Sequence, residues 1–230
     1  DFAIVRISNP KNGNPTFMES GGMRDGPGSE SSITDRNEYT YLPISLQYRP
    51  YTANSEYVRK VSLGGDIIEV MENSIKKMVK ENRSYYGKIG IITNEKHLDL
   101  VLNTASAAKK TIVVVDASNP MIFGEFESEV DAILVGFGGN RAANVPDKAF
   151  LEIIAGKVEP SGLLPLQMPA NMETVEAQFE DVPRDMECYL DNEGNTYDFA
   201  FGLNWSGVIK DERTARYDVP PVVGEAPEKN

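Results

Sequence analysis

Runs of apolar residues alternate with polar segments along the chain, and the pattern predicts buried strands separated by helices. Residues 2–7 open the chain as an apolar run, residues 111–116 are rich in β-branched side chains, and residues 132–137 form another apolar run. Runs this uniformly apolar are typical of parallel strands buried on both faces, because an exposed face would carry alternating polar side chains. A further strand is predicted over residues 163–168, which end at Pro169.

The segments between these strands carry helical signals, which are apolar residues at every third or fourth position or capping residues. Four segments qualify: residues 66–80, a segment that Asn94 can cap, residues 119–128 and residues 147–155. Strand, helix and strand in succession require right-handed crossovers. The expected fold class is therefore α/β, a mostly parallel sheet with helices on both faces, arranged as an α/β sandwich.

Two segments near the start lack helical or strand periodicity. Residues 9–40 are rich in Gly, Pro, Ser and Asn, and we expect them to form a long irregular insertion after the first strand. Connections are usually about 4–6 residues long, and much longer ones are generally functional or disordered. Residues 43–57 carry Tyr48, Tyr51 and Tyr57 and are expected to be ordered without regular structure.

The charge balance narrows the range of partners. The 230-residue chain has a formal net charge of −12 and no concentrated cluster of Lys and Arg, so we expect no nucleic-acid partner. No apolar run approaches the roughly 18–20 residues that cross a bilayer, so no membrane contact is expected from this segment. The sequence leaves the compartment open between a soluble bacterial cytoplasmic setting and a secreted or cell-surface one.

Residue types that often carry chemistry are scarce or poorly placed. The single cysteine, Cys188, is expected to be a half-buried apolar residue, because no histidine lies near it in sequence. The single histidine, His97, lies far from any acidic cluster, so no metal site is expected. Residues 136–141 imitate a dinucleotide fingerprint, but Arg141 occupies its third glycine position, so no cofactor is expected.

Two segments in the second half of the chain carry a recognisable pattern. Residues 159–169 read Glu-Pro-Ser-Gly-Leu-Leu-Pro-Leu-Gln-Met-Pro, and residues 197–205 read Tyr-Asp-Phe-Ala-Phe-Gly-Leu-Asn-Trp. They resemble the paired signatures that close the second domain of family 3 glycoside hydrolases, the β-glucosidase-like family, although Ala200 and Asn204 depart from the second signature. The resemblance covers nearly the whole chain, to about Ile209.

The resemblance implies both a domain and its missing partner. Residues 1–209 are expected to form the C-terminal α/β sandwich domain, without its first strand, and residues 210–230 an exposed tail. In the family the catalytic nucleophile is an aspartate on an N-terminal barrel domain, in a Ser-Asp-Trp-like setting that this sequence lacks. That barrel, in cis or as a separate chain, is therefore the expected partner in hydrolysing a β-glycoside substrate. The fragment alone is expected to be inactive.

The resemblance also implies a second catalytic carboxyl group, on this chain. Retaining glycosidases use two carboxyl groups roughly 5–5.5 Å apart, one as the nucleophile and the other as the general acid/base. In many members of the family the acid/base is a glutamate on a long loop after an early strand of this domain. The corresponding loop of this chain offers three glutamates: Glu19, Glu30 and Glu38.

Two of these glutamates are the candidates for the acid/base. Glu30, which Asp35 and Arg36 follow, resembles the family's Glu-Gly-x-Asp-Arg-x-x-Leu pattern with two extra residues inside it. Glu19 lies in a more glycine-rich setting, whereas Glu38 lies too close to the ordered segment that follows. The ordinary alternative for each of them is a solvated loop carboxylate, which is the commonest environment of a glutamate.

Aromatic side chains are the expected substrate contacts, because sugar rings stack on flat apolar surfaces. The candidates for outer subsites are Phe17, Tyr48, Tyr51 and Trp205. Packing in the core or at a domain interface is the ordinary alternative for each, since buried aromatic residues supply much of the packing area. The alternative function for the whole chain is a non-catalytic carbohydrate-binding or accessory domain of the same fold.

Overall fold

The computed structural model divides the chain into two compact units. It describes residues 2–13, 16–18, 22–24, 38–40, 43–61, 67–72, 75–82, 84–137, 147–179, 182 and 184–217. The sheet unit consists of Asp1–Asn9 together with Lys96–Asn230, and the loop unit consists of Pro10–Glu95. The expected domain over residues 1–209 includes the whole loop unit and most of the sheet unit, and its boundaries stay a prediction.

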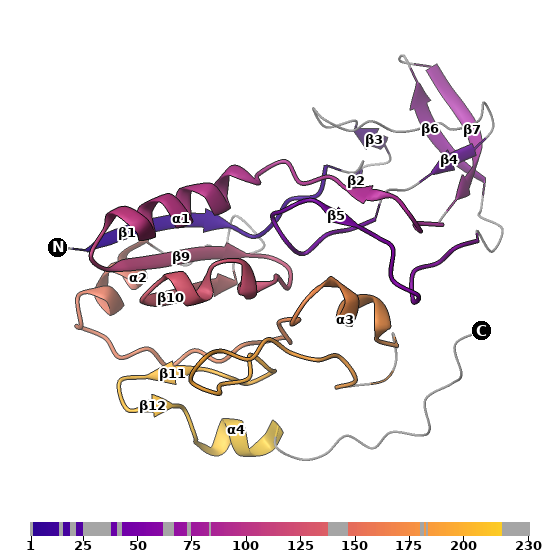
Figure 1. Cartoon of the computed structure of the whole chain (residues 1–230). Helices are drawn as coiled ribbons and strands as arrows, with labels where there is room; N and C mark the ends of the chain where they lie inside the picture. The colour runs from indigo at the N-terminus through magenta and orange to yellow at the C-terminus, as the bar shows by residue number, and fades with distance from the viewer. Residues whose placement is uncertain are drawn as a thin grey trace. The chain divides into compact units, whose positions relative to one another are not determined.

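The sheet unit is built on parallel strands (Figure 1). β1 (Ala3–Ser8) and β10 (Ala132–Phe137) each pair in parallel with β9 (Thr111–Ala117), in the order β1-β9-β10. These strands confirm three of the predicted apolar runs to within one residue at each end. Parallel neighbours need crossover connections, and those connections here contain helices. The fold class is α/β, as the apolar pattern predicts.

Helix α1 (Lys96–Ala107) covers one face of this sheet. It packs on β1 and β9, and its Leu98 and Val101 are buried. The strand residues Val5 and Val113 are neighbours in register and are 5% and 0% exposed. Because alternate residues of a strand point to the same face, this face of the sheet forms the apolar core of the unit.

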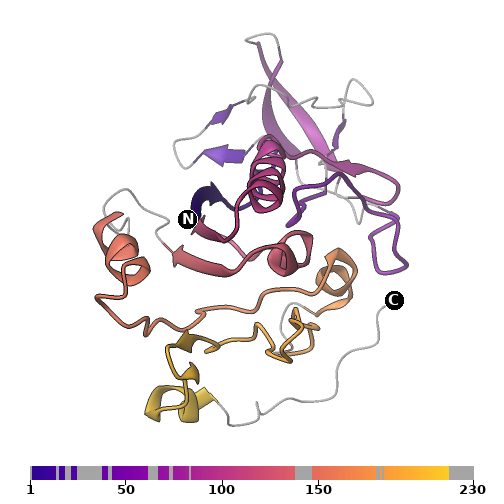
Figure 2. The ribbon, with the colours of Figure 1, turned by 60° about the vertical axis from the view of Figure 1, so that its left-hand side comes forward.

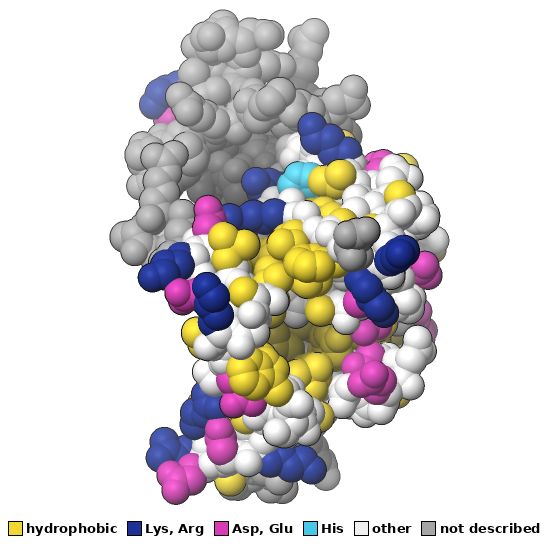
Figure 3. Space-filling view, turned by 90° about the vertical axis from the view of Figure 1, so that its left-hand side faces the viewer, with side chains coloured by type: hydrophobic (Ala, Val, Ile, Leu, Met, Phe, Trp, Pro, Cys, Tyr) yellow, Lys and Arg dark blue, Asp and Glu magenta, His cyan; other side chains and the backbone are white. Residues whose placement is uncertain are grey.

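The opposite face of the sheet is covered less completely. Helix α2 (Asp147–Ile154) lies there, because Arg6 of β1 pairs with Asp147 and its guanidinium lies 6.0 Å from the centroid of the Phe150 ring. Figure 2 shows α1 and α2 on different sides of the sheet. Ile4, which shares the Arg6 face, is 44% exposed. Hydrophobic side chains also gather on the side of the molecule drawn in Figure 3, a pattern typical of surfaces that contact other protein.

Shorter elements complete the sheet unit. The helix predicted over residues 147–155 is confirmed as α2, and Gly156 follows it with a φ of 67°, the left-handed conformation that ends many helices. The helix predicted over residues 119–128 is instead two 3-10 turns, η1 (Phe123–Glu125) and η2 (Glu127–Glu129). The remaining elements are α3 (Met172–Ala177), β11 (Leu203–Asn204), β12 (Gly207–Val208) and α4 (Glu212–Tyr217).

The strand predicted over residues 163–168 is wrong. These residues form no strand; Leu164 and Met168 instead donate separate backbone hydrogen bonds to Phe201 and Tyr197, at 2.7 and 3.0 Å. Pro165 lies between them and has no N–H to donate, so a continuous ladder is interrupted. An apolar run is therefore not sufficient for a strand when a proline divides it.

The helix predicted over residues 66–80 is also wrong. In the loop unit, β6 (Ile67–Glu72) pairs antiparallel with β7 (Ile75–Asn82), from Ile67 opposite Lys80 to Glu72 opposite Ile75. The segment is rich in Ile and Val, whose branched side chains favour strands over helices. Two residues, an Asn-Ser pair, separate the strands in sequence, which is the commonest length of a hairpin connection.

Short strands also occur where an irregular insertion is predicted. The described part of residues 9–40 contains β2 (Thr16–Met18), β3 (Gly22–Arg24) and β4 (Glu38–Thr40). β2 pairs antiparallel with β3, and β4 pairs in parallel with β7. Pairing of three residues needs no apolar alternation, so periodicity does not reveal it. Residues 43–50 are ordered without helix or strand, as predicted, and lead into β5 (Tyr51–Thr52), which pairs antiparallel with β8 (Ile89–Gly90).

Aromatic side chains of the sheet unit pack around one carboxylate. The rings of Phe123 and Tyr197 have centroids 5.4 Å apart, and Tyr189 meets Tyr197 edge-on at 5.2 Å. The Tyr189 hydroxyl donates to Glu127 at 2.9 Å, and the Tyr197 hydroxyl donates to the other oxygen of Glu127 at 3.4 Å. Burial and the hydrogen bond to Glu127 raise the pKa of Tyr189 to about 12, so this hydroxyl stays protonated and keeps donating.

Tyr189→Phe is expected to destabilise the sheet unit by about 1.5 kcal/mol, because Glu127 loses a hydrogen-bond donor in a half-buried place. The measurement is urea unfolding of this chain, followed by the fluorescence of Trp205, its single tryptophan. Tyr217→Phe is the control, since Tyr217 is 40% exposed and its expected change is within about 0.5 kcal/mol. Equal changes in the two variants would contradict a specific contribution from the Glu127 bond.

Candidate functional site

Polar side chains gather where the parallel strands end. Ser8 of β1 and Asp116 of β9 are neighbours in register near the carboxyl ends of their strands. Asn9 follows β1 directly, and its side-chain oxygen accepts hydrogen bonds from the N–H and the hydroxyl of Ser118, at 3.0 and 3.2 Å. Ligands of open α/β sheets bind at the carboxyl ends of the strands, so this edge is the candidate site of the sheet unit.

Arg6 holds two carboxylates at this edge. Its guanidinium donates two hydrogen bonds to Asp116, at 2.8 and 2.9 Å, and also pairs with Asp147. These hydrogen bonds raise the pKa of Arg6 above its already high value, so the guanidinium stays charged. Asp116 and Asp147 therefore act as acceptors in ion pairs, which does not suit a general acid that must carry a proton.

The chain that leaves β1 is fixed by a short antiparallel pairing within the loop unit. The Gly13 N–H donates to the carbonyl of Ile91 at 2.8 Å, and the Thr93 N–H donates to the carbonyl of Lys11 at 2.9 Å. The Lys11 N–H in turn donates to the side-chain oxygen of Asn94 at 2.8 Å. This stretch is therefore held in place before the segment that contains the candidate glutamates begins.

Asn12, in this same stretch, also binds the chain that follows the glutamate-bearing segment. The side-chain nitrogen of Asn12 donates to the carbonyl of Ser45 at 3.1 Å, and its side-chain oxygen accepts from the Ser45 N–H at 2.8 Å. Gly90 lies against this return, since a Cβ there would be 3.1 Å from the carbonyl oxygen of Pro43. Asn12 and Ser45, which lie before and after the part of the sequence that contains Glu19, Glu30 and Glu38, are thus held beside each other.

The candidate catalytic glutamates themselves, Glu19 and Glu30, lie outside the described residues. Glu38 begins β4, where it is the register partner of Lys80 in β7, but its side chain is not among those described. The choice of acid/base therefore stays a prediction. The described residues show only the hydrogen bonds between Asn12 and Ser45, which lie before and after this part of the sequence.

The candidate aromatic contacts differ in exposure. Trp205, in the turn between β11 and β12, is 62% exposed, whereas Tyr48 is 0% exposed and has no ring face to offer a sugar in this structure. Tyr51 lies in β5 and is half-buried. Phe17 lies in β2, and its side chain is outside those described. Trp205 and Tyr51 are the candidates with accessible surface.

The two signature segments of the sequence pack against each other in the sheet unit. The Leu164 N–H donates to the carbonyl of Phe201 at 2.7 Å, and the Ala200 N–H donates to the carbonyl of Leu164 at 2.8 Å. The Trp205 N–H donates to the carboxylate of Glu159 at 3.3 Å. The signatures therefore join two distant stretches of the chain into one substructure.

Comparison with known proteins identifies the family to which these signature segments point. Residues 67–205, more than half of the chain, match the family model of the glycosyl hydrolase family 3 C-terminal domain. The chain belongs to this family. The match includes both signature segments together with β9 and β10, and it begins after the segment that contains the candidate glutamates.

Curated relatives of this family 3 domain carry β-glucosidase names. Beta-glucosidase C of Emericella nidulans is 25% identical over 198 residues, which cover 81% of this chain and 31% of the relative. Probable beta-glucosidase C of Aspergillus oryzae is 31% identical over 100 residues, which cover 44% of this chain and 14% of the relative. The chain thus spans less than a third of the length of these relatives. No solved structure matches it.

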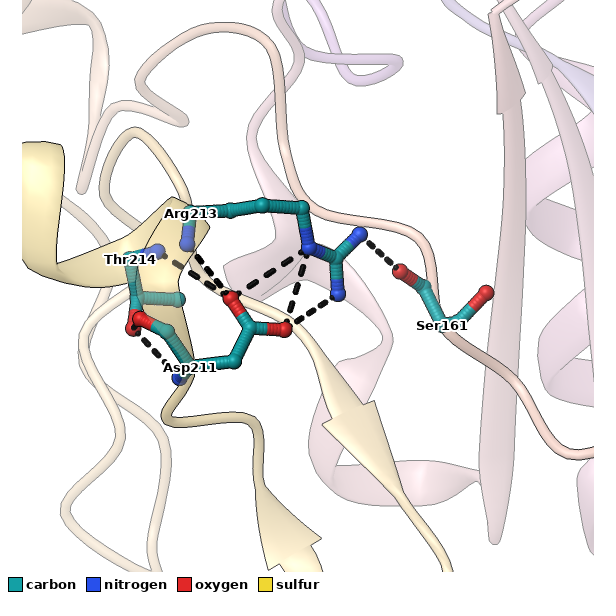
Figure 4. A network of polar contacts seen from close by, with 4 residues as sticks. All are labelled: Ser161, Asp211, Arg213 and Thr214. Carbon is teal, nitrogen blue, oxygen red and sulfur yellow. Dashed lines mark hydrogen bonds and ion pairs between the residues drawn. The ribbon is translucent and has the colours of Figure 1, made fainter.

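A polar network ties α4, the last described helix, to the first signature segment (Figure 4). Arg213 donates to the carbonyl of Ser161 at 2.8 Å and to the carboxylate of Asp211 at 2.7 Å. Asp211 also accepts from the N–H groups of Arg213 and Thr214, at 2.8 and 3.3 Å, at the start of α4. The sequence predicts an exposed tail here. The signal for the helix was the aspartate one residue before its first turn, a typical capping residue.

The cysteine of the family 3 domain lacks the chemistry of a nucleophile. Burial raises the pKa of Cys188 to about 11, and the side chain of Gln167 donates to its sulfur at 3.2 Å. A protonated, half-buried thiol agrees with the interpretation from sequence. Among the described residues, no three His, Cys, Asp or Glu side chains are grouped to hold a metal ion, and no described helix is long and apolar enough to cross a membrane.

Proposed function

We propose that this chain is the second domain of a retaining β-glycosidase that removes terminal β-linked sugars, as a β-glucosidase does. Its membership of the glycosyl hydrolase family 3 C-terminal domain supports the reaction class, and so do the names of the relatives. Because the chain spans 31% of the E. nidulans relative, the proposal assigns the rest of the catalytic machinery to another part of the enzyme.

The proposal divides the two catalytic carboxyl groups between domains. This chain supplies Glu30 or Glu19 as the general acid/base, and an N-terminal barrel domain supplies the aspartate nucleophile. The observation that carries this division is the link between the chain before and the chain after the glutamate-bearing segment. There Asn12 binds Ser45 through both polar atoms of its side chain. A catalytic carboxyl group must be held in a defined place, and a segment anchored at both ends can do this.

The two carboxyl groups carry the reaction through two displacements. In the first, the glutamic acid donates its proton to the glycosidic oxygen as the bond from that oxygen to the anomeric carbon breaks, while the aspartate forms a bond to that carbon. In the second, the glutamate takes a proton from water as the water oxygen displaces the aspartate. The accessible rings of Trp205 and Tyr51 supply outer stacking surfaces for the sugar or aglycone.

The test compares this chain alone, the barrel domain alone and the two together on phenyl β-glucoside, whose leaving group departs slowly without a proton. Turnover is expected when both parts are present, because each contributes one of the two carboxyl groups that the reaction needs. Phenyl α-glucoside is the matched control and is expected to stay intact. Turnover by this chain without the barrel would contradict the assignment of the two catalytic carboxyl groups to different domains.

The exposed ring of Trp205 favours a second candidate, a non-catalytic carbohydrate-binding domain. Electrophoresis of this chain through a gel containing soluble β-glucan distinguishes the two functions. The binding function would be favoured by two results together. The chain would be retarded in the gel, with the Trp205→Ala variant no longer retarded, and the chain would fail to support hydrolysis by the barrel. Hydrolysis that depends on the chain, with no retardation in the gel, would favour the catalytic one.

A further inference from the structure

We propose that Glu159 and Trp205 together form a subsite for a β-linked glucose unit of an oligosaccharide. The indole ring of Trp205 stacks on the sugar, and the carboxylate of Glu159 accepts hydrogen bonds from the sugar hydroxyl groups. The choice of ligand rests on the proposed function, in which the chain is part of a β-glycosidase. Each of the two residues belongs to one signature segment, and the backbones of the two segments are hydrogen-bonded to each other in the sheet unit.

Trp205 is held at the tip of a short hairpin. Asn204 of β11 is the register partner of Gly207 in β12, so Trp205 and Ser206 form a two-residue connection between the strands. The side-chain oxygen of Asn204 accepts from the Ser206 N–H at 2.9 Å, which fixes this turn. The indole is 62% exposed at this fixed place. Exposed tryptophans are frequent centres of binding sites, because binding removes a large apolar surface from water.

Glu159 brings a charged acceptor to this turn from the other signature segment. One oxygen of its carboxylate accepts from the Trp205 N–H at 3.3 Å, and the other oxygen accepts no hydrogen bond within the part of the chain that the structure describes. The backbone of Glu159 is restricted because Pro160 follows it, and the Ser161 carbonyl is bound by Arg213 at 2.8 Å. The second oxygen is therefore held beside the residue that carries the exposed ring, where a hydroxyl group of a stacked sugar can reach it.

The carboxylate favours a sugar over an apolar protein surface as the occupant. A protein surface that covers Trp205 would also take the charge of Glu159 out of water, which costs free energy unless the partner supplies hydrogen-bond donors. A sugar offers several hydroxyl donors around an apolar ring face, so one ligand satisfies both side chains. β-Linked glucose suits the indole, because all of its ring substituents are equatorial and both of its faces present C–H groups.

The fluorescence of Trp205 reports binding at this subsite directly, since Trp205 is the single tryptophan of the chain. Cellotriose and laminaritriose, which are trimers of β-linked glucose, are titrated separately into this chain. At least one of them is expected to shift the emission to saturation. Maltotriose has α linkages, whose axial oxygen interrupts one face of the sugar, and it is expected to bind at least about 5-fold more weakly.

Glu159→Gln keeps the size of the side chain and the acceptor for the Trp205 N–H but removes the charge. Its affinity for the trimer is expected to fall about 5-fold, because hydrogen bonds to charged groups are about twice as strong as neutral ones. Glu193→Gln, at an exposed position in another turn of the sheet unit, is the matched control and is expected to keep the affinity of the wild type. Trp205→Ala has no emission to follow, so saturation-transfer NMR of the trimer measures its expected loss of about 10-fold or more.

An emission that responds to neither β-linked trimer would overturn the subsite and leave the exposed ring as a contact for another part of the enzyme. Equal affinities of the wild type and Glu159→Gln would overturn the role of the carboxylate, and equal binding of maltotriose would overturn the choice of ligand. Hydrolysis of phenyl β-glucoside by the assembled enzyme is measured separately. Trimer binding without this hydrolysis contradicts the proposed function alone, and hydrolysis without trimer binding overturns this inference alone.

Discussion

Glu30→Gln in the complete enzyme is expected to lower kcat/KM on phenyl β-glucoside by about 10²–10⁴-fold, the usual contribution of general acid/base catalysis. The amide keeps the size of the side chain but has no proton to give to the departing oxygen. On 2,4-dinitrophenyl β-glucoside the first displacement is expected to continue, because that leaving group needs no proton. Glu19→Gln is measured beside it, and the same pattern identifies Glu19 if it is the acid/base instead.

Azide gives an independent check on the same variants. The small anion can attack the anomeric carbon of the glycosyl-enzyme and release the aspartate without a base, which forms a glycosyl azide. Azide is therefore expected to raise turnover of the activated substrate by the variant that lacks the acid/base, and not by the wild type. Glu38→Gln is the matched control from the same stretch of sequence, with full activity on both substrates expected.

Unchanged activity in both glutamate variants would show that neither Glu30 nor Glu19 is the acid. The carboxylates at the sheet edge are poor replacements, because Asp116 and Asp147 both accept hydrogen bonds from Arg6. The accessory, carbohydrate-binding function or an acid from another part of the enzyme would then be favoured. A working acid also needs its pKa raised by burial against the sugar and the partner domain, so the assay requires the assembled enzyme.

The parallel strands were predictable because their burial leaves a strong mark on the sequence. A strand covered on both faces needs apolar residues at nearly every position, and residues 112–115 of β9 and 132–137 of β10 are apolar without interruption. β1 departs from the pattern at Arg6, which lies on the less covered face beside α2. The local sequence and the burial agree best at β9, where Val113, Val114 and Val115 are 0%, 4% and 0% exposed.

The two wrong predictions of secondary structure also have local causes. Over residues 66–80 the apolar residues fit helical spacing, yet branched Ile and Val side chains and a two-residue connection favour the β6–β7 hairpin. Over residues 163–168 the apolar run is real, but Pro165 cannot join a ladder. Periodicity reports which side chains are buried, and the backbone chemistry of individual residues then decides the element.

The candidate site was less predictable than the fold. Tyr48 was a candidate for a sugar contact, but its ring is wholly buried, whereas Trp205, another candidate, is 62% exposed. Exposure depends on tertiary packing, which one sequence does not reveal. Asn12 illustrates the converse, since an asparagine in a polar stretch has no sequence signal until its partner Ser45 is known. The two signature segments identified the family from sequence, and in the structure their backbones are hydrogen-bonded to each other.

Gly202→Ala is expected to be among the most damaging single substitutions in the sheet unit, because Gly202 is where the two signature segments touch. A Cβ at this position would overlap the carbonyl oxygen of Gly162 and lie 3.1 Å from a methyl group of Leu163. The overlap is with backbone, which cannot move aside without breaking the hydrogen bond between Leu164 and Phe201. We expect a loss of about 3 kcal/mol or more in the free energy of unfolding, since such overlap is at the upper end of overpacking costs.

Gly162→Ala is the matched control, since it places a methyl group on the other side of the same contact. A Cβ on Gly162 would have no atom within 4 Å, and its backbone is outside the left-handed region, so a change of at most about 0.5 kcal/mol is expected. Thermal unfolding of this chain, followed by the fluorescence of Trp205, compares the two; the expected fall for Gly202→Ala is roughly 10 °C. Equal stability of the two variants would mean that the signature segments do not require close contact. Their pairing could then not explain why the domain carries both.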